Sequence, residues 1–356
     1  MSKEFYSLKV CAVREETEGC VSVELNVPEQ FKNQFNFHAG QYLTFKMILN
    51  GEEVRRSYSL CSAPSENSWR VAIKAISNGL FSTYANAHIQ VGDSLEVMPP
   101  MGNFKFEPKP ESQNHYVLFA AGSGITPILS ILKTILFLEP KSCVTLFYGN
   151  KTMADVIFRE ELEALKNQFL DKMNLVYLFS RENIGVPILK GRIDRERTEQ
   201  LLKAFLSGQP LQSAYICGPQ QMILEVKDEL LNFGLDPQHI HFELFHASPI
   251  APKNHASQVV ESSIESKIEI IMDGEITNFY LSSNGPSILD AAYKAGADAP
   301  YACKGGVCCT CKAKVLRGEV SMDVNYALTP EEVEEGYVLT CQAHPKSKDI
   351  LISFDN

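Results

Sequence analysis

The chain of 356 residues is 45% hydrophobic and 21% charged, which is ordinary for two or three globular domains. Its formal net charge of −10 argues against nucleic acid as a partner. The first ten residues contain no apolar signal sequence, and the most apolar stretch, Ile125 to Leu138, is too short to cross a bilayer and is interrupted by Lys133. We therefore expect a cytoplasmic protein without a membrane partner, whose ten cysteines stay reduced.

Short β-strands are predicted over the first hundred residues, because apolar and polar residues alternate there between turn signals. The turn signal Asn50-Gly51 directly follows one of these segments. Short strands at regular spacing predict a barrel or a sandwich. The expected strands are Cys20 to Val27, Gln41 to Leu49, Arg70 to Ile76 and Ser94 to Met98.

After about residue 115, strands alternate with helices, which predicts βαβ units and a parallel sheet. The expected strands are Tyr116 to Ala121, Val144 to Tyr148, Asn174 to Ser180 and Ala214 to Cys217. One helix is expected to start near Pro127, and the other helices to cover Ala154 to Gln168, Glu196 to Leu206 and Gln220 to Phe233.

A glycine-rich turn, Gly122-Ser123-Gly124-Ile125-Thr126-Pro127, joins the first of these strands to its helix. In such a turn, backbone N–H groups at the helix N-terminus face a nucleotide pyrophosphate. Pro127 stands where a dinucleotide-binding motif carries its third glycine, and proline fits the first turn of a helix. The turn therefore predicts a nucleotide site.

The last third of the chain begins with a predicted linker at 247–263, which starts with a segment rich in Pro, Ala and Ser. Strands are expected at Lys267 to Met272 and Thr277 to Leu281, and one helix at Ser287 to Ala295. Acidic residues outnumber basic ones beyond residue 264. This excess indicates either a solvated acidic surface or electrostatic steering toward a basic electron acceptor.

Four cysteines follow that helix with a spacing that predicts an iron–sulfur site. The pattern is Cys-x4-Cys-x2-Cys, then 29 residues, then Cys, which is the spacing of plant-type [2Fe–2S] proteins. Structural zinc usually takes paired Cys-x2-Cys knuckles, and only one such pair occurs here. Disulfides are the remaining alternative, which the expected reducing compartment disfavours. The four predicted metal ligands are Cys303, Cys308, Cys311 and Cys341.

The loop that holds three of these ligands contains Gly305 and Gly306, which are free to take positive φ and to direct N–H groups at the cluster sulfurs. Cys309 lies inside the loop but off the ligand spacing. We expect it to be a free thiol.

A barrel followed by a parallel sheet, with the motifs Arg56-Ser57-Tyr58-Ser59 and Cys217-Gly218-Pro219, resembles the ferredoxin–NADP reductase superfamily. With the cysteine spacing at its end, the whole chain is similar to reductases of multicomponent oxygenases of the phenylacetyl-CoA epoxygenase and Rieske types. The resemblance implies an antiparallel β-barrel FAD domain at 1–110 and an α/β parallel-sheet NADP domain at 111–246. An α+β β-grasp ferredoxin domain is implied at 264–356, after the linker.

The resemblance implies that the first of these motifs binds a flavin, with Arg56 on the phosphate, Tyr58 against the isoalloxazine and Ser59 near N5. Gly79-Leu80-Phe81-Ser82 is similar to the family's pyrophosphate turn, which implies FAD rather than FMN. The alternatives are a strand with an exposed arginine and an ordinary helix cap by Ser82 and Thr83. The implied flavin-binding residues are Arg56, Ser57, Tyr58, Ser59, Ile73, Lys74, Gly79, Leu80 and Ser82.

In relatives, the Cys-Gly-Pro cysteine sits beside nicotinamide C4, and the segment His241 to Phe245 brings a carboxylate and an aromatic ring close to the flavin. The alternatives are a buried core thiol and a last buried strand. The implied catalytic residues are Ser59, Cys217 and Glu243. The implied nucleotide-binding residues are Gly122, Gly124, Thr126, Pro127, Ser180, Arg181, Cys217, Gly218, Pro219 and Phe245.

Ser180-Arg181 follows a predicted strand at the position where NADP-dependent relatives carry Ser-Arg. A hydroxyl group and a cation suit the 2′-phosphate of NADPH, and Arg192 is a candidate to assist. The resemblance therefore implies NADPH rather than NADH, while the alternative is a surface arginine in an ion pair.

We thus expect an NAD(P)H-dependent oxidoreductase that passes electrons from NADPH through FAD and [2Fe–2S] to a separate oxygenase. The histidines form no His-x-x-His or Glu-x-x-His pattern that would indicate an oxygen-activating site in this chain. One alternative is the electron-transfer subunit of a dihydroorotate dehydrogenase, whose last cysteine comes sooner after the third. The other is a redox sensor with a structural cluster.

Overall fold

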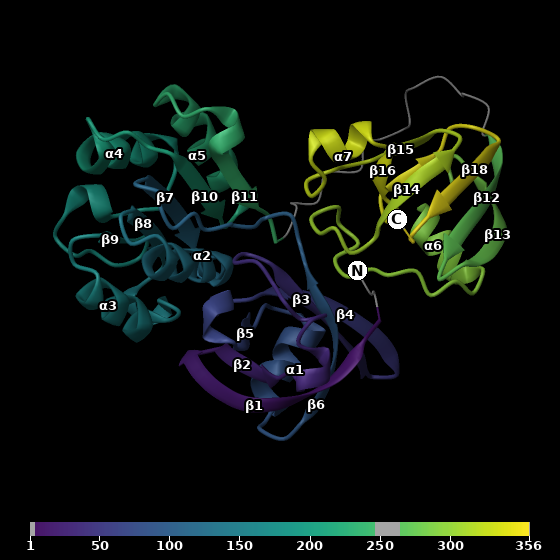
Figure 1. Cartoon of the computed structure of the whole chain (residues 1–356), viewed down its shortest axis with the longest axis horizontal. Coiled ribbons are helices and arrows are strands. Elements are labelled where there is room, and N and C mark those ends of the chain that lie inside the picture. The colour runs from purple at the N-terminus through teal and green to yellow at the C-terminus, as the bar shows by residue number, and fades with distance from the viewer. Residues whose placement is uncertain (1–3, 246–263, 356) are drawn as a thin grey trace. The chain divides into compact units, whose positions relative to one another are not determined.

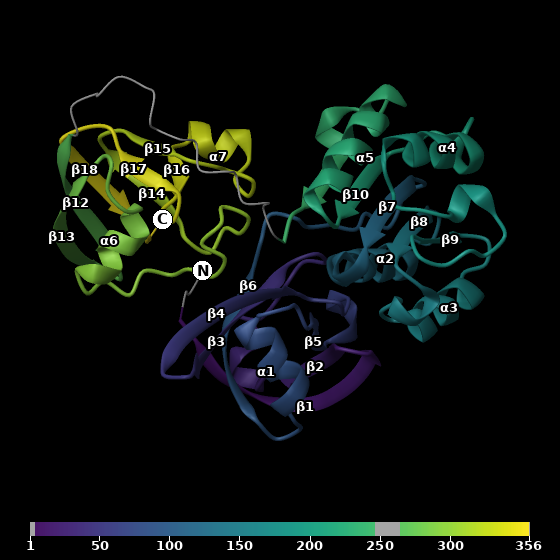
Figure 2. The same cartoon turned by 180° about the vertical axis from the view of Figure 1, so that it is seen from behind.

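The computed structural model describes residues 4–245 and 264–355, and the chain divides into two compact units, Met1–Phe245 and His246–Asn356 (Figures 1 and 2). The predicted linker at 247–263 lies outside the described residues. Within the described ranges, no helix is both long and apolar enough to cross a membrane.

The first unit opens with a six-stranded antiparallel sheet in the order β4-β3-β6-β1-β2-β5. Its edge strands are joined by a bridge between Leu60 and Val71, which closes the sheet into the predicted barrel. The expected turn at Asn50-Gly51 is present, and both residues have positive φ, as a tight hairpin requires. The strands are β1 (Tyr6–Thr17), β2 (Cys20–Asn26), β3 (Tyr42–Leu49), β4 (Glu52–Ser59), β5 (Trp69–Lys74) and β6 (Ser94–Met101).

Short helical segments connect the barrel strands. The α-helix α1 (Leu80–His88) packs on β5 and adds Phe81 and Ala85 to a core built mainly by the inward-facing residues of the strands. The 3₁₀ turns are η1 (Glu29–Phe31) and η2 (Pro64–Glu66).

A parallel sheet in the order β11-β10-β7-β8-β9 follows, with α2 and α3 on one face and α4 and α5 on the other (Figure 1). The strands are β7 (His115–Ala121), β8 (Cys143–Asn150), β9 (Met173–Phe179), β10 (Ser213–Cys217) and β11 (Ile240–Glu243). The α-helices are α2 (Ile125–Leu138), α3 (Arg159–Gln168), α4 (Arg195–Leu206) and α5 (Gln220–Asn232). The 3₁₀ turns are η3 (Gly122–Gly124), η4 (Met153–Asp155), η5 (Pro187–Leu189) and η6 (Pro237–His239).

Two helix starts differ from the prediction. The helix expected from Ala154 begins at Arg159, because Phe158 has a φ of 59° and the preceding turn η4 is closed separately by hydrogen bonds between Thr152 and Asp155. Helix α2 begins at Ile125 rather than near Pro127, since a proline is tolerated throughout the first helical turn.

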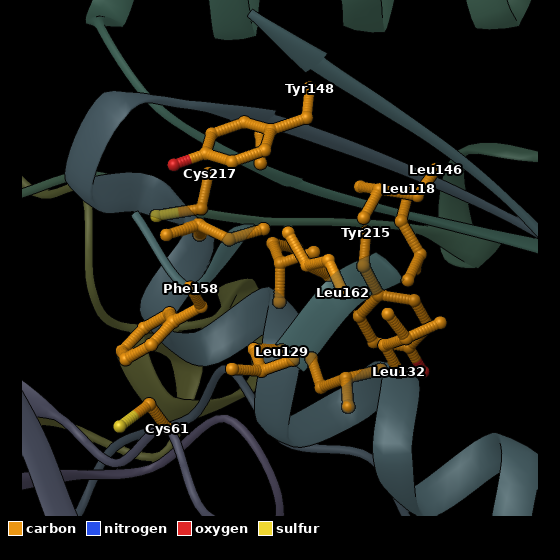
Figure 3. Packing of buried hydrophobic residues seen from close by; sticks show 14 of the residues in the cluster. Cys61, Leu118, Leu129, Leu132, Leu146, Tyr148, Phe158, Leu162, Tyr215 and Cys217 are labelled. Atoms are coloured by element: carbon orange, nitrogen blue, oxygen red, sulfur yellow. The ribbon is translucent and has the colours of Figure 1, made fainter. Parts of the chain in front are cut away.

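A hydrophobic cluster fills the space between the parallel sheet and helices α2 and α3, and Figure 3 shows part of it. Leu129 and Leu132 of α2 pack there with Leu118 and Leu146 of the strands. Residues of the barrel, Cys61 among them, belong to the same cluster, so the barrel and the parallel sheet share one apolar core.

The second unit contains a mixed five-stranded sheet in the order β13-β12-β18-β14-β16 and a two-stranded ribbon of β15 and β17. The pairing of β12 with β18 is parallel and that with β13 is antiparallel, and α6 packs into the core, which confirms the expected α+β domain. The strands are β12 (Glu265–Met272), β13 (Glu275–Ser282), β14 (Lys312–Arg317), β15 (Val320–Met322), β16 (Tyr337–Leu339), β17 (Ala343–Pro345) and β18 (Asp349–Ser353). The helices are α6 (Ile288–Lys294) and α7 (Pro330–Glu334).

Truncation of Leu129 tests the shared core. Leu129 is fully buried, so Leu129→Ala is expected to lower the free energy of unfolding of the first unit by about 2–5 kcal/mol through the cavity it leaves. Leu224→Ala in α5 is the matched control, because Leu224 is 54% exposed and its loss should change stability by less than about 0.5 kcal/mol. Urea denaturation measures both, and equal effects would contradict the assignment of this core.

Candidate functional site

The Arg-x-Tyr-Ser motif occupies the end of the edge strand β4. Arg56 is exposed, and its Nη1 donates to the carbonyl of Arg55 at 2.7 Å. The ring of Tyr58 lies 5.6 Å from that of Phe81, with the planes tilted by 35°. The hydroxyl groups of Ser57 and Thr44 are 3.0 Å apart. The motif thus presents a cation, a ring and a hydroxyl group from one strand end.

The Gly79 turn leads directly into helix α1. The N-cap residue of this helix is Gly79. The capping role considered for Ser82 and Thr83 is therefore wrong, because both residues lie within the first helical turn. Ser82 Oγ accepts a hydrogen bond from the Ile76 N–H at 3.3 Å, and a Cβ on Gly79 would lie 2.4 Å from that Oγ. The turn therefore requires glycine, while Leu80 beside it is exposed.

The end of strand β5 faces the same region of the barrel. Ile73 is fully buried, and its carbonyl accepts a hydrogen bond from Asn86 Nδ2 at 2.9 Å. Lys74 is half-buried and pairs with Cys20 of β2. Because the bridge between Leu60 and Val71 joins β5 to the end of β4, both strand ends belong to one site.

The glycine turn after β7 lies against the turn after β10. A Cβ on Gly124 would lie 2.2 Å from the Cys217 carbonyl oxygen and 3.0 Å from the Gly218 nitrogen, so only glycine permits this approach. Gly122 has a φ of 53°. Thr126 Oγ1 donates to the Ser123 carbonyl at 3.0 Å, which closes the turn.

Further predicted residues lie around this turn, at the carboxyl ends of the strands. Pro219 caps helix α5, and a Cβ on Gly218 would meet the side chain of Met222. Phe245, beyond the end of β11, packs partly buried against the core of the parallel sheet. Carboxyl ends of parallel strands meet at one edge, where α/β proteins bind nucleotides.

The three predicted catalytic residues come together at this edge. Cys217 and Glu243 are register partners in the parallel pair of β10 and β11. Ser59 Oγ, from the barrel, donates to Glu243 Oε2 at 3.0 Å. The fold thus places Glu243 next to Ser59, which lies 184 residues earlier in the chain, and next to Cys217, which lies 26 residues earlier.

Burial controls the protonation of this group of side chains. It raises the pKa of Glu243 to about 8, although the hydrogen bond from Ser59 acts in the opposite direction. Burial also raises the pKa of the Cys217 thiol, and the nearby Glu243 carboxyl adds to the effect. Both shifts favour the neutral form of the side chain.

Ser180 and Arg181 follow β9 at the same edge of the sheet. The Ser180 N–H donates to the Asn150 carbonyl at 3.0 Å and the Arg181 N–H to the Lys151 carbonyl at 2.8 Å. The side chains of Arg181 and Arg192 are exposed. The side chain of Glu182 is held by the preceding loop, because its Oε2 accepts a hydrogen bond from the Met153 N–H at 2.7 Å.

The four cysteines of the second unit form two pairs. Cys308 Sγ and Cys303 Sγ are 3.1 Å apart, and the Cys311 thiol is hydrogen-bonded to Cys341. Within the described ranges, no group of three or more His, Cys, Asp or Glu side chains has the geometry of a single-ion site. Two pairs of thiols match a [2Fe–2S] cluster, in which each of two irons takes two thiolates, better than a single tetrahedral zinc.

Backbone contacts hold the cysteine loop. The Gly305 N–H donates to Cys303 Sγ at 3.3 Å, which fits the expected stabilisation of negative sulfur. The positive φ expected at Gly306 is present, at 72°, whereas Gly305 does not have it and Lys304 takes a φ of 52°. At Gly306 a Cβ would lie 2.8 Å from Val324 Cγ2, so the loop is packed closely there.

Two further residues shape these sites without a signal in the sequence. Thr340 donates from Oγ1 and from its N–H to the Cys311 carbonyl, at 3.0 and 3.1 Å, which holds the fourth ligand beside the third. Tyr148 donates from its hydroxyl to the Gly122 carbonyl at 3.0 Å and so supports the glycine turn.

Cys309, as a thiol off the ligand spacing, donates to the Ala327 carbonyl at 3.4 Å.

Three domain-family models match the chain. They are the oxidoreductase FAD-binding domain at residues 9–106, the oxidoreductase NAD-binding domain at 118–228 and the 2Fe-2S iron-sulfur cluster binding domain at 270–346. The predicted order of flavin, nicotinamide nucleotide and [2Fe–2S] domains is therefore confirmed, as is the assignment of the chain as an oxidoreductase.

Similar proteins match over nearly the whole chain. A component of the 1,2-phenylacetyl-CoA epoxidase of Escherichia coli K12 is 42% identical over 99% of this chain and 98% of its own length. The ferredoxin reductase component of 3-ketosteroid-9-alpha-monooxygenase from Rhodococcus rhodochrous is 32% identical over 98% and 96%. The solved structure of phthalate dioxygenase reductase covers 98% of both chains with a TM-score of 0.59 at 24% identity, which confirms the fold.

Titration of Glu243 is expected near pH 8, the value to which burial raises its pKa. Because this pKa lies above the ordinary 4.5, the stability contributed by the protonated group is fully present below about pH 4.5 and is lost as the pH rises through 8. Difference infrared spectroscopy of the protein against Glu243→Gln should show a carboxylic acid C=O band at pH 7 that disappears above about pH 8. The exposed Glu107, whose pKa is lowered by its hydrogen bond with Lys105, should give no such band when compared with Glu107→Gln, and a Glu243 already ionised at about pH 6 would contradict the assignment.

Proposed function

Because this chain belongs to the family of reductases that join FAD-binding, NAD-binding and [2Fe–2S] domains, we propose that it takes electrons from NADPH and passes them singly to a separate oxygenase. The observation that carries the proposal is the meeting of Ser59, Cys217 and Glu243, which joins the flavin motif to the nucleotide edge of the parallel sheet. A bound flavin accepts hydride and releases electrons one at a time, and a [2Fe–2S] cluster carries single electrons.

The end of β4 and the start of α1 supply the proposed flavin site. The exposed guanidinium of Arg56 is suited to a phosphate, and Tyr58 with Ser57 provides a ring and a hydroxyl group for the isoalloxazine. The turn at Gly79, with Leu80 and Ser82, leads into a helix N-terminus that suits the pyrophosphate of FAD.

The edge of the parallel sheet supplies the proposed nicotinamide site. The turn from Gly122 to Pro127 leads into the N-terminus of α2, a position that favours a pyrophosphate. The turn at Cys217, Gly218 and Pro219 lies against Gly124 and so offers a surface for the nicotinamide ring.

Ser59 and the protonated Glu243 carboxyl would hold the isoalloxazine ring of the flavin, which accepts the hydride. A carboxylate at this position would oppose the arrival of negative charge, whereas a protonated carboxyl offers a hydrogen-bond donor. The Cys217 thiol beside Glu243 is fully buried, which limits the access of water to this side of the site.

The protein acceptor is proposed to be an oxygenase of the kind that its relatives serve. Two relatives that match nearly the full length are components of an epoxidase and of a monooxygenase. The higher identity to the component of 1,2-phenylacetyl-CoA epoxidase favours an epoxidase of CoA thioesters, and the second match supports a hydroxylase as the alternative.

The proposal also covers the domain limits and the location. The change from antiparallel pairing in β6 to parallel pairing in β7 supports a boundary near residue 110 between FAD and NADP domains. None of the ten cysteines, all of which lie within the described residues, forms a disulfide, and this supports a cytoplasmic location, because thiols stay reduced in that compartment.

Loss of one cluster ligand tests the order of electron transfer. Cys341→Ser should abolish NADPH-driven reduction of cytochrome c, which takes electrons from the cluster, and leave ferricyanide reduction, which proceeds from the flavin, within about twofold. Cys309→Ser is the control, because this thiol lies off the ligand spacing and donates to the Ala327 carbonyl. If Cys341→Ser reduced cytochrome c at the normal rate, or if the unmodified protein reduced neither acceptor, the proposed route would be wrong.

Removal of one side chain tests the nucleotide preference. Arg181→Ala should lower kcat/KM for NADPH by about tenfold to a hundredfold, because a hydrogen bond to a charged group contributes ~1.5–3 kcal/mol, and leave NADH unaffected. Arg195→Ala, which removes an exposed arginine paired with Asp228 and Glu229 on the α4–α5 surface, should change neither value. An unchanged ratio of NADPH to NADH rates in Arg181→Ala would refute the assignment of the 2′-phosphate site.

A further inference from the structure

Helix α2 carries a lysine in the middle of its apolar sequence. Lys133 is only 3% exposed, and a buried cation is unfavourable unless it is paired. Its Nζ donates to both carboxylate oxygens of Glu66, at 2.9 and 3.1 Å, and also contacts the carboxylate of Glu161. One lysine thus joins a carboxylate of the barrel to a carboxylate of helix α3.

The same Glu161 binds a second cation from the barrel. Arg70 of β5 donates from Nη2 to both of its oxygens, at 2.9 and 2.6 Å, and the guanidinium lies over the ring of Phe158 at 5.1 Å. Burial alone would raise the pKa of Glu161, but the charges of Lys133 and Arg70 outweigh it and lower that pKa. We call Glu66, Arg70, Lys133 and Glu161 the interdomain ion network.

The network connects the segments that carry the two halves of the active site. Glu66 and Arg70 lie on the stretch that runs from the flavin motif, which ends at Ser59, into strand β5. Lys133 lies two turns into the helix that starts at the glycine turn. A buried hydrogen bond from Ser130 Oγ to the Ser62 carbonyl, at 2.6 Å, joins the same two segments.

A polar cavity of about 860 Å³ adjoins the network between the barrel and helix α3. Its lining includes Glu16, Glu24, Ser68 and Arg159 together with Arg70 and Glu161. Beside the apolar core that they share, α3 and the barrel are therefore also connected by ion pairs at this cavity. Paired charges have directional contacts, so they restrict the angle between two bodies more than apolar contacts of similar area do.

We propose that the interdomain ion network is a positioning device for hydride transfer, which sets the orientation of the barrel relative to the parallel sheet. This inference rests on the proposed function of the site. The four side chains act through the segments they join, and a displacement of about 1 Å at the reacting atoms lowers a rate by about a hundredfold. The network should therefore affect flavin reduction by NADPH and not the later transfer from flavin to cluster.

The test replaces Lys133 in the full-length, FAD- and cluster-loaded protein. Lys133→Met should lower the stopped-flow rate of flavin reduction at saturating NADPH by about tenfold or more, with KM for NADPH within about twofold. The charge-transfer absorption of the nicotinamide–flavin complex should weaken, and the flavin-to-cluster rate after photoreduction should stay unchanged. Lys133→Arg, which keeps the charge, should restore most of the rate.

Lys203→Met is the matched control, because Lys203 pairs with Glu199 on α4 but is 67% exposed, and it should behave as the unmodified protein does. Glu161→Gln is a second variant that keeps the side-chain size, and it should reproduce the slow flavin reduction. Normal flavin reduction with full charge-transfer absorption in both Lys133→Met and Glu161→Gln would overturn the proposal. So would a rise in KM alone, an equal slowing of both electron-transfer steps, or failure of both variants to fold with FAD bound, since each indicates a different role.

The unmodified protein separates this inference from the function on which it rests. If it reduced its flavin with neither NADPH nor NADH, the proposed function would fail and the positioning role with it. If the unmodified protein is active and the network variants reduce their flavin at the same rate, only the positioning role is wrong.

Discussion

The hydrogen bond from Ser59 to Glu243 is the interaction on which the proposed active site depends. It joins the last residue of a barrel strand to the last residue of a strand in the parallel sheet, at 3.0 Å. The carboxyl group is half-buried and its pKa is raised, so the protonated form of Glu243 is favoured as the partner of Ser59. Hydride transfer requires two cofactors at one place, and this contact marks where the two halves of the first unit meet.

Polar contacts of two kinds therefore hold together halves that share one apolar core. The common hydrophobic cluster gives the association most of its stability, but apolar packing is tolerant of small rotations. The hydrogen bond at Glu243 and the ion network around Lys133 are directional, and they lie on separate elements. A buried ion pair is weak evidence for stability, so orientation is the more reasonable physical role for this network.

Much of the fold follows from short-range patterns in the sequence. Alternation in the barrel strands, the Asn50-Gly51 turn and the strand–helix alternation after residue 115 each depend on neighbouring residues, and the structure contains all of them. Errors occur where a local conformation competes with the pattern. Phe158 adopts positive φ and delays helix α3, and Lys304 takes the left-handed conformation expected of Gly305. A periodicity in hydrophobicity does not report such single backbone angles.

By itself the sequence determined which chemical groups are available: four thiols at plant-type spacing, a glycine turn before a helix, and an arginine, a tyrosine and a serine on one strand. These are local arrangements, and the chain's covalent geometry is enough to define them. Only the tertiary structure decided that Cys303 pairs with Cys308 and Cys311 with Cys341, that Glu243 accepts a hydrogen bond from Ser59, and that the lysine within an apolar helix binds two carboxylates. Contacts between distant segments depend on strand order and burial, and neither is encoded in the spacing of neighbouring residues.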